Sequence, residues 1–262
     1  METPLNILVI EDDPSINEVV CAHLERQGHR CTAAFSGTEG TLQAAQHPFD
    51  LVITDLMLPG AAGEEVVRAI RRTDAALPII VISARITPAD KIALLELGAD
   101  DYLTKPFDLD ELSARVAVQR RHHARSAGGE GAGTGARAGT SLTAGAPAAG
   151  TAGPDAGAGA FPERLLHFRA WTLNQDARTL TVGGAEVALT RTEFNILELL
   201  MTRPQKVFTK QELFELAWGE PYSVEDSTVN VHVSNLRRKL KPTGTDGYIQ
   251  TVWGMGFKLA GA

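Results

Sequence analysis

A 35-residue stretch in the middle of the chain, residues 126–160, constrains the fold more than any other feature of the sequence. Eleven of these residues are Gly and twelve are Ala, and Leu142 is the only large apolar side chain among them. Such a composition cannot bury enough apolar surface to offset the entropy lost when a backbone is ordered. We therefore expect a first domain at 1–125, a Gly/Ala-rich disordered linker at 126–160 and a second domain at 161–262.

The overall composition is that of a folded protein without a membrane segment. Of the 262 residues, 44% are apolar and 22% are charged, close to the average of soluble proteins. No apolar run approaches the roughly 20 residues that cross a bilayer. Cys21 and Cys31 are too few for a disulfide framework and match no zinc pattern. We expect a cytoplasmic protein with no membrane partner.

The net charge of −7 is unevenly distributed along the chain. Residues 1–125 hold 12 basic and 19 acidic side chains, whereas residues 161–262 hold 12 basic and 11 acidic ones. Because binding depends on local patches rather than on total charge, the acidic whole does not exclude nucleic acid as a partner of the second domain.

Strand and helix patterns alternate five times along the first domain. Four continuous apolar runs are typical of parallel strands buried on both faces, at residues 7–10, 51–54, 79–83 and 101–104. Asp13 before Pro14 marks one helix start, and three others have an acid three residues after a capping side chain, namely Ser36, Thr87 and Asp108. This order predicts an α/β doubly wound (βα)5 fold.

Polar side chains stand where the predicted strands end. The carboxyl ends of parallel strands meet at one edge of the sheet, which would gather Glu11, Asp12, Asp13, Asp55, Ser83 and Lys105. Repulsion among carboxylates favours a divalent cation, and an all-oxygen ligand set suits Mg²⁺. Ionised Asp55 then has the role of a nucleophile toward phosphorus, while Lys105 and the Ser83 hydroxyl contact the phosphoryl oxygens.

The motifs ILVIEDD, TDLMLPG, IIVISA and GADDYLTKPF resemble the receiver domain of two-component response regulators over residues 5–122. The resemblance implies that a sensor histidine kinase phosphorylates Asp55, that Ser83 and Tyr102 form a switch pair, and that Lys105 contacts the phosphate. It also implies a cis Lys105–Pro106 bond. The implied magnesium site comprises Glu11, Asp12, Asp55 and the backbone carbonyl of Met57.

In regulators of this type, the face made by the fourth helix, fifth strand and fifth helix forms a two-fold dimer. Here that face carries side chains of both charge signs: Lys91, Asp100, Asp101, Glu111 and Arg115. Isologous contacts pair such charges reciprocally, so we expect a homodimer on phosphorylation. The alternative is that these are ordinary solvated charges, whose surface ion pairs contribute little individually.

The second domain has the pattern of a small sheet, three helices and a terminal hairpin. The sheet segments are residues 165–171, 178–182 and 186–189, and the predicted helices run over 190–201, 209–218 and about 227–240. The hairpin pairs residues 248–252 with 257–260. This order predicts an α+β domain.

The third of these helices has a polar surface opposite a row of Val and Leu. Asn side chains can read adenine, and Arg can contact guanine or phosphate. The basic cluster at 237–241 equally suits the negative end of the helix dipole, which is the structural alternative.

The motifs LTRTEFNILELL, TKQELFELAWG, VEDSTVNVHVSNLRRKL and IQTVWGMGFKL resemble the winged-helix output domain of OmpR/PhoB-type regulators over about residues 164–260. The resemblance makes the third helix the recognition helix and the hairpin the wing. Trp253 stands where many members have an Arg, and either contacts DNA or packs in the core. The candidate DNA contacts are Thr228, Asn230, Ser234, Asn235, Arg237, Arg238 and Trp253.

Together these features predict a transcription regulator rather than an enzyme, with Mg²⁺ as cofactor and a sensor histidine kinase, promoter DNA and RNA polymerase as partners. One alternative is a regulator that binds DNA without phosphorylation. Another is an aspartate-nucleophile phosphohydrolase, which shares an acidic magnesium site. That enzyme class needs a second Asp two residues after Asp55, where this chain has Met57, and it leaves residues 161–262 without a role.

Overall fold

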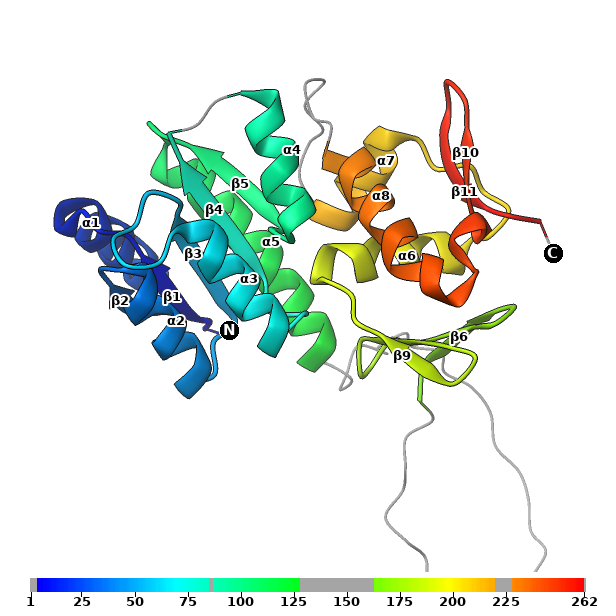
Figure 1. Cartoon of the computed structure of the whole chain (residues 1–262), viewed down its shortest axis with the longest axis horizontal. Helices are drawn as coiled ribbons and strands as arrows, with labels where there is room; N and C mark the ends of the chain where they lie inside the picture. The colour runs from blue at the N-terminus through cyan, green and yellow to red at the C-terminus, as the bar shows by residue number, and fades with distance from the viewer. Residues whose placement is uncertain (1–3, 85–86, 128–162, 220–227, 262) are drawn as a thin grey trace, which may run out of the picture.

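The computed structural model describes residues 4–84, 87–127, 163–219 and 228–261. These residues form two folded units, an N-terminal α/β unit and a C-terminal α+β unit (Figure 1). The last N-terminal helix extends through Ala127, two residues into the predicted linker. The rest of that linker lies outside the described residues.

The N-terminal unit alternates strands and helices as predicted. Its five parallel strands lie in the order β2-β1-β3-β4-β5. The elements are β1 (Asn6–Ile10), α1 (Pro14–Arg26), β2 (Arg30–Ala34), α2 (Gly37–Gln46), β3 (Leu51–Asp55), α3 (Gly63–Thr73), β4 (Ile79–Ser83), α4 (Pro88–Leu97), β5 (Asp101–Thr104) and α5 (Leu109–Ala127). The predicted doubly wound fold is therefore confirmed.

The strand β2 has no apolar run in the sequence, because it lies at the edge of the sheet. Its sequence is RCTAA, and most of its residues are only partly buried. The central strands β3 and β4 are buried along their whole length. An edge strand is covered less completely than these, so its composition carries a weaker signal.

Helices cover both faces of this sheet. Side chains of α1 and α5 pack with one set of strand residues, for example Leu24 and Val116 against Ile53. Side chains of α3 and α4 pack with the other set, for example Val66 and Leu94. Apolar packing thereby covers both faces of the sheet. The polar side chains of the candidate site lie at the edge where the strands end.

A buried asparagine ties that edge to the first helix. Asn17 is 1% exposed, and its Nδ2 donates to the carbonyls of Glu11 and Ala34, both at 3.1 Å. Asp13 caps the same helix by accepting from the Ser15 amide at 2.8 Å. The two interactions hold the acidic loop at the end of β1 in place.

The C-terminal unit begins with a four-stranded antiparallel sheet, β6 (Leu165–Phe168), β7 (Trp171–Asn174), β8 (Thr179–Val182) and β9 (Ala185–Val187). The prediction of one strand over 165–171 is wrong. The chain turns at Arg169, whose φ is 51°, and β6 pairs with β7. Phe168 of β6 and Trp171 of β7 pack in the same core. The turn between the two strands therefore does not interrupt the pattern of apolar residues in the sequence.

Three helices and a hairpin complete this unit, namely α6 (Arg191–Thr202), α7 (Lys210–Trp218), α8 (Thr228–Leu240), β10 (Ile249–Val252) and β11 (Gly256–Leu259). Thr190 and Thr209 form complete capping boxes with Glu193 and Glu212, as the spacing indicates. The sheet, helices and hairpin share one apolar core around Trp171 and Phe194. The predicted winged-helix architecture is confirmed.

The two units meet along two helices. α4 of the N-terminal unit lies beside α8 of the C-terminal unit (Figure 1). None of the helices within the described ranges is long and apolar enough to cross a membrane.

Candidate functional sites

The ends of β1, β3 and β5 bring two buried carboxylates and one ammonium group together. Glu11 is 4% exposed and Asp55 is 6% exposed. Lys105 Nζ donates to Glu11 Oε2 at 2.7 Å and to Asp55 Oδ2 at 2.6 Å. The predicted convergence of these three side chains is therefore present in the structure.

The other carboxylate oxygen of Asp55 is held by the chain that follows it. Asp55 Oδ1 accepts from the backbone amides of Leu56 and of Met57, the latter at 3.1 Å. Gly63 lies close by, where a Cβ atom would stand 2.2 Å from the Asp55 carbonyl oxygen. This close approach requires glycine, and it fixes the loop after β3.

The charges in this pocket shift one another's pKa values. Burial raises the pKa of Glu11, the charge of Asp55 raises it further, and Lys105 opposes both effects. Burial by itself would lower the pKa of Lys105, but its hydrogen bonds to Asp55 and Glu11 outweigh burial, so that this pKa is raised. Lys105 therefore stays a cation beside the two carboxylates.

The pocket has the donor chemistry of a magnesium site. Carboxylate oxygens of Glu11, Asp12 and Asp55 all lie within 4.8 Å of one another, and Asp12 is exposed at the mouth. Hard oxygen donors of this kind fit Mg²⁺, which keeps several waters and binds through one or two carboxylates. The Met57 side chain is 63% exposed, and a role for its carbonyl remains a prediction.

Ser83 of the predicted switch pair lies beside this pocket. Ser83 is 2% exposed at the end of β4, and its carbonyl accepts from the Lys105 amide at 2.8 Å. Tyr102 lies on β5, with Lys91 Nζ of α4 4.6 Å from its ring centroid. The aromatic ring thus connects β5 with α4.

All five charged residues of the predicted dimer face have partners within the chain, and one of these contacts joins the face to α3. Arg115 donates to Asp101 at 2.6 Å and to Glu111 at 3.0 Å. Asp100 is fully buried and pairs with Arg71 at 2.7 Å. In this arrangement Asp100 belongs to the contact between the two units rather than to the open face.

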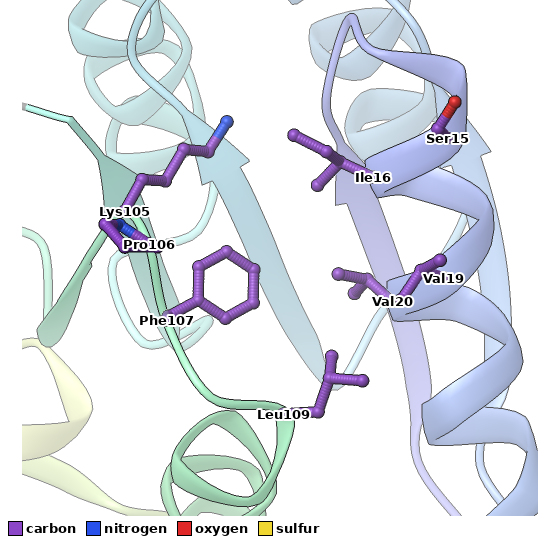
Figure 2. A pocket seen from close by; sticks show the side chains of 8 residues that line it. All are labelled: Ser15, Ile16, Val19, Val20, Lys105, Pro106, Phe107 and Leu109. Carbon is purple, nitrogen blue, oxygen red and sulfur yellow. The ribbon is translucent and has the colours of Figure 1, made fainter.

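An apolar groove of about 610 Å³ opens next to Lys105. Figure 2 shows Lys105, Pro106, Phe107 and Leu109 on one side and residues of α1 on the other. The α1 residues are Ser15, Ile16, Val19 and Val20, of which Val19 is 51% exposed. The groove places carbon surface directly beside the acidic pocket, and the sequence patterns did not indicate it.

In the C-terminal unit, the candidate DNA contacts on α8 divide into two groups. Asn230, Ser234 and Arg238 are exposed. Thr228 and Asn235 are 2% and 3% exposed, so the predicted polar surface is not entirely solvated. Asn235 Nδ2 donates to the Leu95 carbonyl of α4 at 2.9 Å.

Arg237 joins α8 to the hairpin. Its Nη2 donates to the Ile249 carbonyl at 2.8 Å and to Thr251 Oγ1 at 2.9 Å. Burial lowers the pKa of this guanidinium, which nevertheless stays charged at neutral pH. Arg237 therefore positions the hairpin strand β10 relative to α8.

Trp253 extends from the tip of the hairpin. Its side chain is 91% exposed, so the alternative that it packs in the core is wrong. With Asn230 and Lys210 it lines a groove of about 500 Å³ between α8 and the hairpin. Lys210 was not singled out in the sequence, where it lies in the first turn of a predicted helix.

Sequence reasoning also missed His232, a buried residue of α8. It is 1% exposed, and neither ring nitrogen has a hydrogen-bond partner within the described residues. Its ring lies 5.2 Å from that of Trp218. A His between two Val residues on an apolar face gives no sequence signal that separates a core position from a contact between domains.

Comparisons with known proteins match both folded units. Residues 7–117 match the family described as response regulator receiver domain. Residues 184–259 match the family described as transcriptional regulatory protein, C terminal. The fold and the acidic pocket together thus define a two-component response regulator with a DNA-binding domain.

Two relatives align with this chain over nearly its whole length. The chain is 32% identical to the uncharacterized transcriptional regulatory protein YkoG of Bacillus subtilis over 98% of both chains. It is also 32% identical to the response regulator ArlR of Staphylococcus aureus over 97% of this chain and 98% of that one. The protein belongs to the OmpR/PhoB family of response regulators.

A solved structure of a RitR mutant has the same fold over 98% of this chain and 99% of that one, with a TM-score of 0.70. The sequence identity is 22%, so this likeness concerns the fold.

The carboxylate cluster generates a prediction about magnesium. A Mg²⁺ concentration about tenfold above Kd stabilises a folded protein by about 1.4 kcal/mol, and we expect Asp12→Asn to remove most of this gain. The measurement is thermal unfolding with and without Mg²⁺. Asp13→Asn is the matched control, because Asp13 caps α1 outside the cluster and Asn caps a helix equally well. Equal Mg²⁺ responses of the two variants would contradict the assignment.

Proposed function

We propose that the protein is a cytoplasmic transcription regulator, rather than an enzyme, that is switched by phosphorylation of Asp55. In this proposal a sensor histidine kinase is the phosphoryl donor, Mg²⁺ is the cofactor, and the phosphorylated chain dimerises and binds promoter repeats near RNA polymerase. The observation that carries the proposal is the geometry of Asp55, with one oxygen on two backbone amides and the other on Lys105.

This geometry supports Asp55 as the phosphoacceptor. Two amides hold Oδ1, so Oδ2 is the oxygen that would attack phosphorus as its contact with Lys105 opens. Lys105 then stays within reach of the new phosphoryl oxygens and offsets their charge. Bound Mg²⁺ would supply further neutralisation of phosphoryl charge. The electron pair of the broken bond leaves with the donor's group, so the donor loses PO₃ and Asp55 becomes an acyl phosphate.

Phosphate on Asp55 would draw the Ser83 hydroxyl toward it, and Tyr102 would fill the space that Ser83 leaves. Because Lys91 of α4 lies over the Tyr102 ring, movement of that ring acts directly on α4. This is the proposed route from the pocket to the α4–β5–α5 face.

The phosphorylation step predicts a covalent adduct at one residue. Protein incubated with acetyl phosphate and Mg²⁺ is expected to gain one phosphoryl group, located to Asp55 by peptide mass spectrometry after reductive trapping. Asp55→Asn and an EDTA-treated wild type serve as controls and are expected to gain none. An adduct that persists in Asp55→Asn would place the acceptor elsewhere.

The dimer predicts a change in mass on activation. With beryllofluoride, a phosphoryl mimic, sedimentation is expected to shift from monomer toward dimer. The reason is that the charges of the α4–β5–α5 face would then pair with those of a second copy. Glu111→Arg, whose side chain is 49% exposed on that face, is expected to weaken the dimer. Glu18→Arg makes the same charge reversal on exposed α1 and is expected to leave it intact. An unchanged mass in the wild type would remove dimerisation from the mechanism.

The exposed side of α8 and the hairpin tip support DNA binding. Asn230, Ser234 and Arg238 lie on the solvent side of the helix, where Asn and Arg have the donors and acceptors that read base edges. Trp253 offers a large flat apolar surface in place of a cation. Its contact with DNA would therefore add affinity that depends little on salt.

Salt dependence distinguishes the roles of these side chains. On a duplex selected from a random-sequence pool, Asn230→Ala is expected to cost about 1–3 kcal/mol of binding free energy. Trp253→Ala is expected to weaken binding with an unchanged salt slope, whereas Arg238→Ala reduces that slope by about 0.9 if Arg238 contacts a phosphate. The measurement is fluorescence anisotropy across a salt series.

Glu186→Gln in β9 is the control for these variants, because β9 lies across the unit from the hairpin tip (Figure 1). Its affinity is expected to match the wild type. If Asp55→Ala binds the same duplex as tightly as the phosphorylated wild type, the phosphorylation-independent alternative holds instead. The phosphohydrolase alternative gains no support, since an exposed Met57 stands where its second carboxylate would be.

A further inference from the structure

The only two cysteines of the chain lie on neighbouring elements and face each other. Cys21 is on α1 and Cys31 is on β2, the edge strand against which α1 packs. Cys31 is in register with Ile7 of β1, which belongs to the apolar cluster beneath α1. Residues in register on neighbouring strands point to the same face of a sheet, so Cys31 points toward α1. Both thiols are partly buried against this cluster.

The two thiols interact and differ in acidity. A hydrogen bond from Cys31 lowers the pKa of Cys21, although burial and the charge of Glu25 both raise it. The same interaction, together with burial, raises the pKa of Cys31. Because the thiolate is the nucleophilic form of cysteine, Cys21 has the character of an attacking thiol. Cys31 is placed beside it to react in a second step.

A chain of hydrogen bonds runs from Cys21 to the acidic loop after β1. The Cys21 thiol donates to Asn17 Oδ1 at 3.3 Å. On the other side of the amide, Asn17 Nδ2 donates to the carbonyls of Glu11 and Ala34. Asn17 is 1% exposed, and a buried amide oxygen that loses its donor is destabilised. The bonding state of the Cys21 sulfur therefore acts on the backbone of Glu11 through one side chain.

We propose that Cys21 and Cys31 are a redox modification site, which a hydroperoxide converts to a disulfide that weakens the acidic pocket. A disulfide sulfur carries no hydrogen, so the donor to Asn17 Oδ1 is lost. Asn17 then has to move toward a new donor, and its hold on the Glu11 carbonyl loosens. The effect on phosphorylation rests on the proposed function. In a cytoplasm such a disulfide is transient, as expected of a sensor.

The reaction consumes one hydroperoxide per disulfide. The Cys21 thiolate attacks one oxygen of the peroxide, the O–O bond breaks, and the other oxygen leaves as water or an alcohol after taking up a proton. Cys21 is now a sulfenic acid. The Cys31 sulfur attacks the Cys21 sulfur, the S–S bond forms, and the sulfenic oxygen leaves as water with the Cys31 proton. The two sulfurs lose two electrons, which the peroxide gains, and a dithiol reverses the change.

The first measurement is the mass of the folded full chain after treatment with hydrogen peroxide. We expect the wild type to lose two hydrogens, with Cys21 and Cys31 in one cross-linked peptide, and dithiothreitol to restore both thiols. Cys31→Ser keeps only the attacking thiol and is expected to give a sulfenic acid at Cys21 that dimedone captures. Two free thiols in the peroxide-treated wild type would overturn the site.

The second measurement is Mg²⁺ affinity, obtained from thermal unfolding across a Mg²⁺ series. We expect about tenfold weaker binding in the disulfide form, the lower end of what the loss of an outer hydrogen bond costs a metal site. Phosphoryl gain from acetyl phosphate is expected to slow as well. Dithiothreitol is expected to reverse both changes, whereas oxidation of exposed Met57 would persist, because methionine sulfoxide is not reduced by a simple dithiol.

Two variants separate the disulfide from the hydrogen bond. Peroxide-treated Cys31→Ser is expected to keep the Mg²⁺ affinity of the reduced wild type. Cys21→Ala removes the donor to Asn17 without forming a disulfide, and it is expected to bind Mg²⁺ weakly before any oxidation. Should circular dichroism show that Cys31→Ser is misfolded, Cys31→Ala serves as the variant with a single thiol.

A disulfide form with unchanged Mg²⁺ affinity would overturn the coupling to the pocket, and wild-type affinity in Cys21→Ala would overturn the route through Asn17. If the reduced wild type neither binds Mg²⁺ nor gains a phosphoryl group, the failure lies in the proposed function. The mass measurement still decides whether the disulfide forms.

Discussion

The ammonium group of Lys105 between two buried carboxylates is the interaction on which the rest of this protein depends. Glu11 and Asp55 stand at the ends of different strands and would repel each other, and Lys105, which follows a third strand, holds them together. The balance is incomplete, because Asp12 adds a further carboxylate at the mouth. This surplus of negative charge is what suits the pocket to a divalent cation.

A change in that pocket has a short structural route to the second domain. Ser83 is the last residue of β4, and Tyr102 lies on β5, the strand that precedes Lys105. Lys91 of α4 lies over the Tyr102 ring and so connects β5 with α4. α4 in turn contacts α8 through backbone carbonyls and Asp100. The proposed signal therefore crosses the molecule through contacts between neighbouring elements.

Much of the fold could be predicted from the sequence because its signals are local. Asp13, Thr190 and Thr209 start helices with a capping side chain, and the capping geometry is present in each case. The buried runs of β3 and β4 indicated parallel strands. The edge strand β2 was not predicted, because its partial burial leaves no distinct apolar period in the sequence. The turn at Arg169 was not predicted, because the strands on either side of it share one core and their apolar pattern continues through it.

The sequence by itself determined the two-domain order, the doubly wound first domain and the gathering of Glu11, Asp55 and Lys105, since parallel strands bring their carboxyl ends to one edge. Only the tertiary structure decided that Trp253 is exposed, that Arg237 positions the hairpin, and that Asp100 and Asn235 are buried between the domains. The physical reason is that helix periodicity tells which side chains share a face, whereas the partner of that face depends on how separate elements pack.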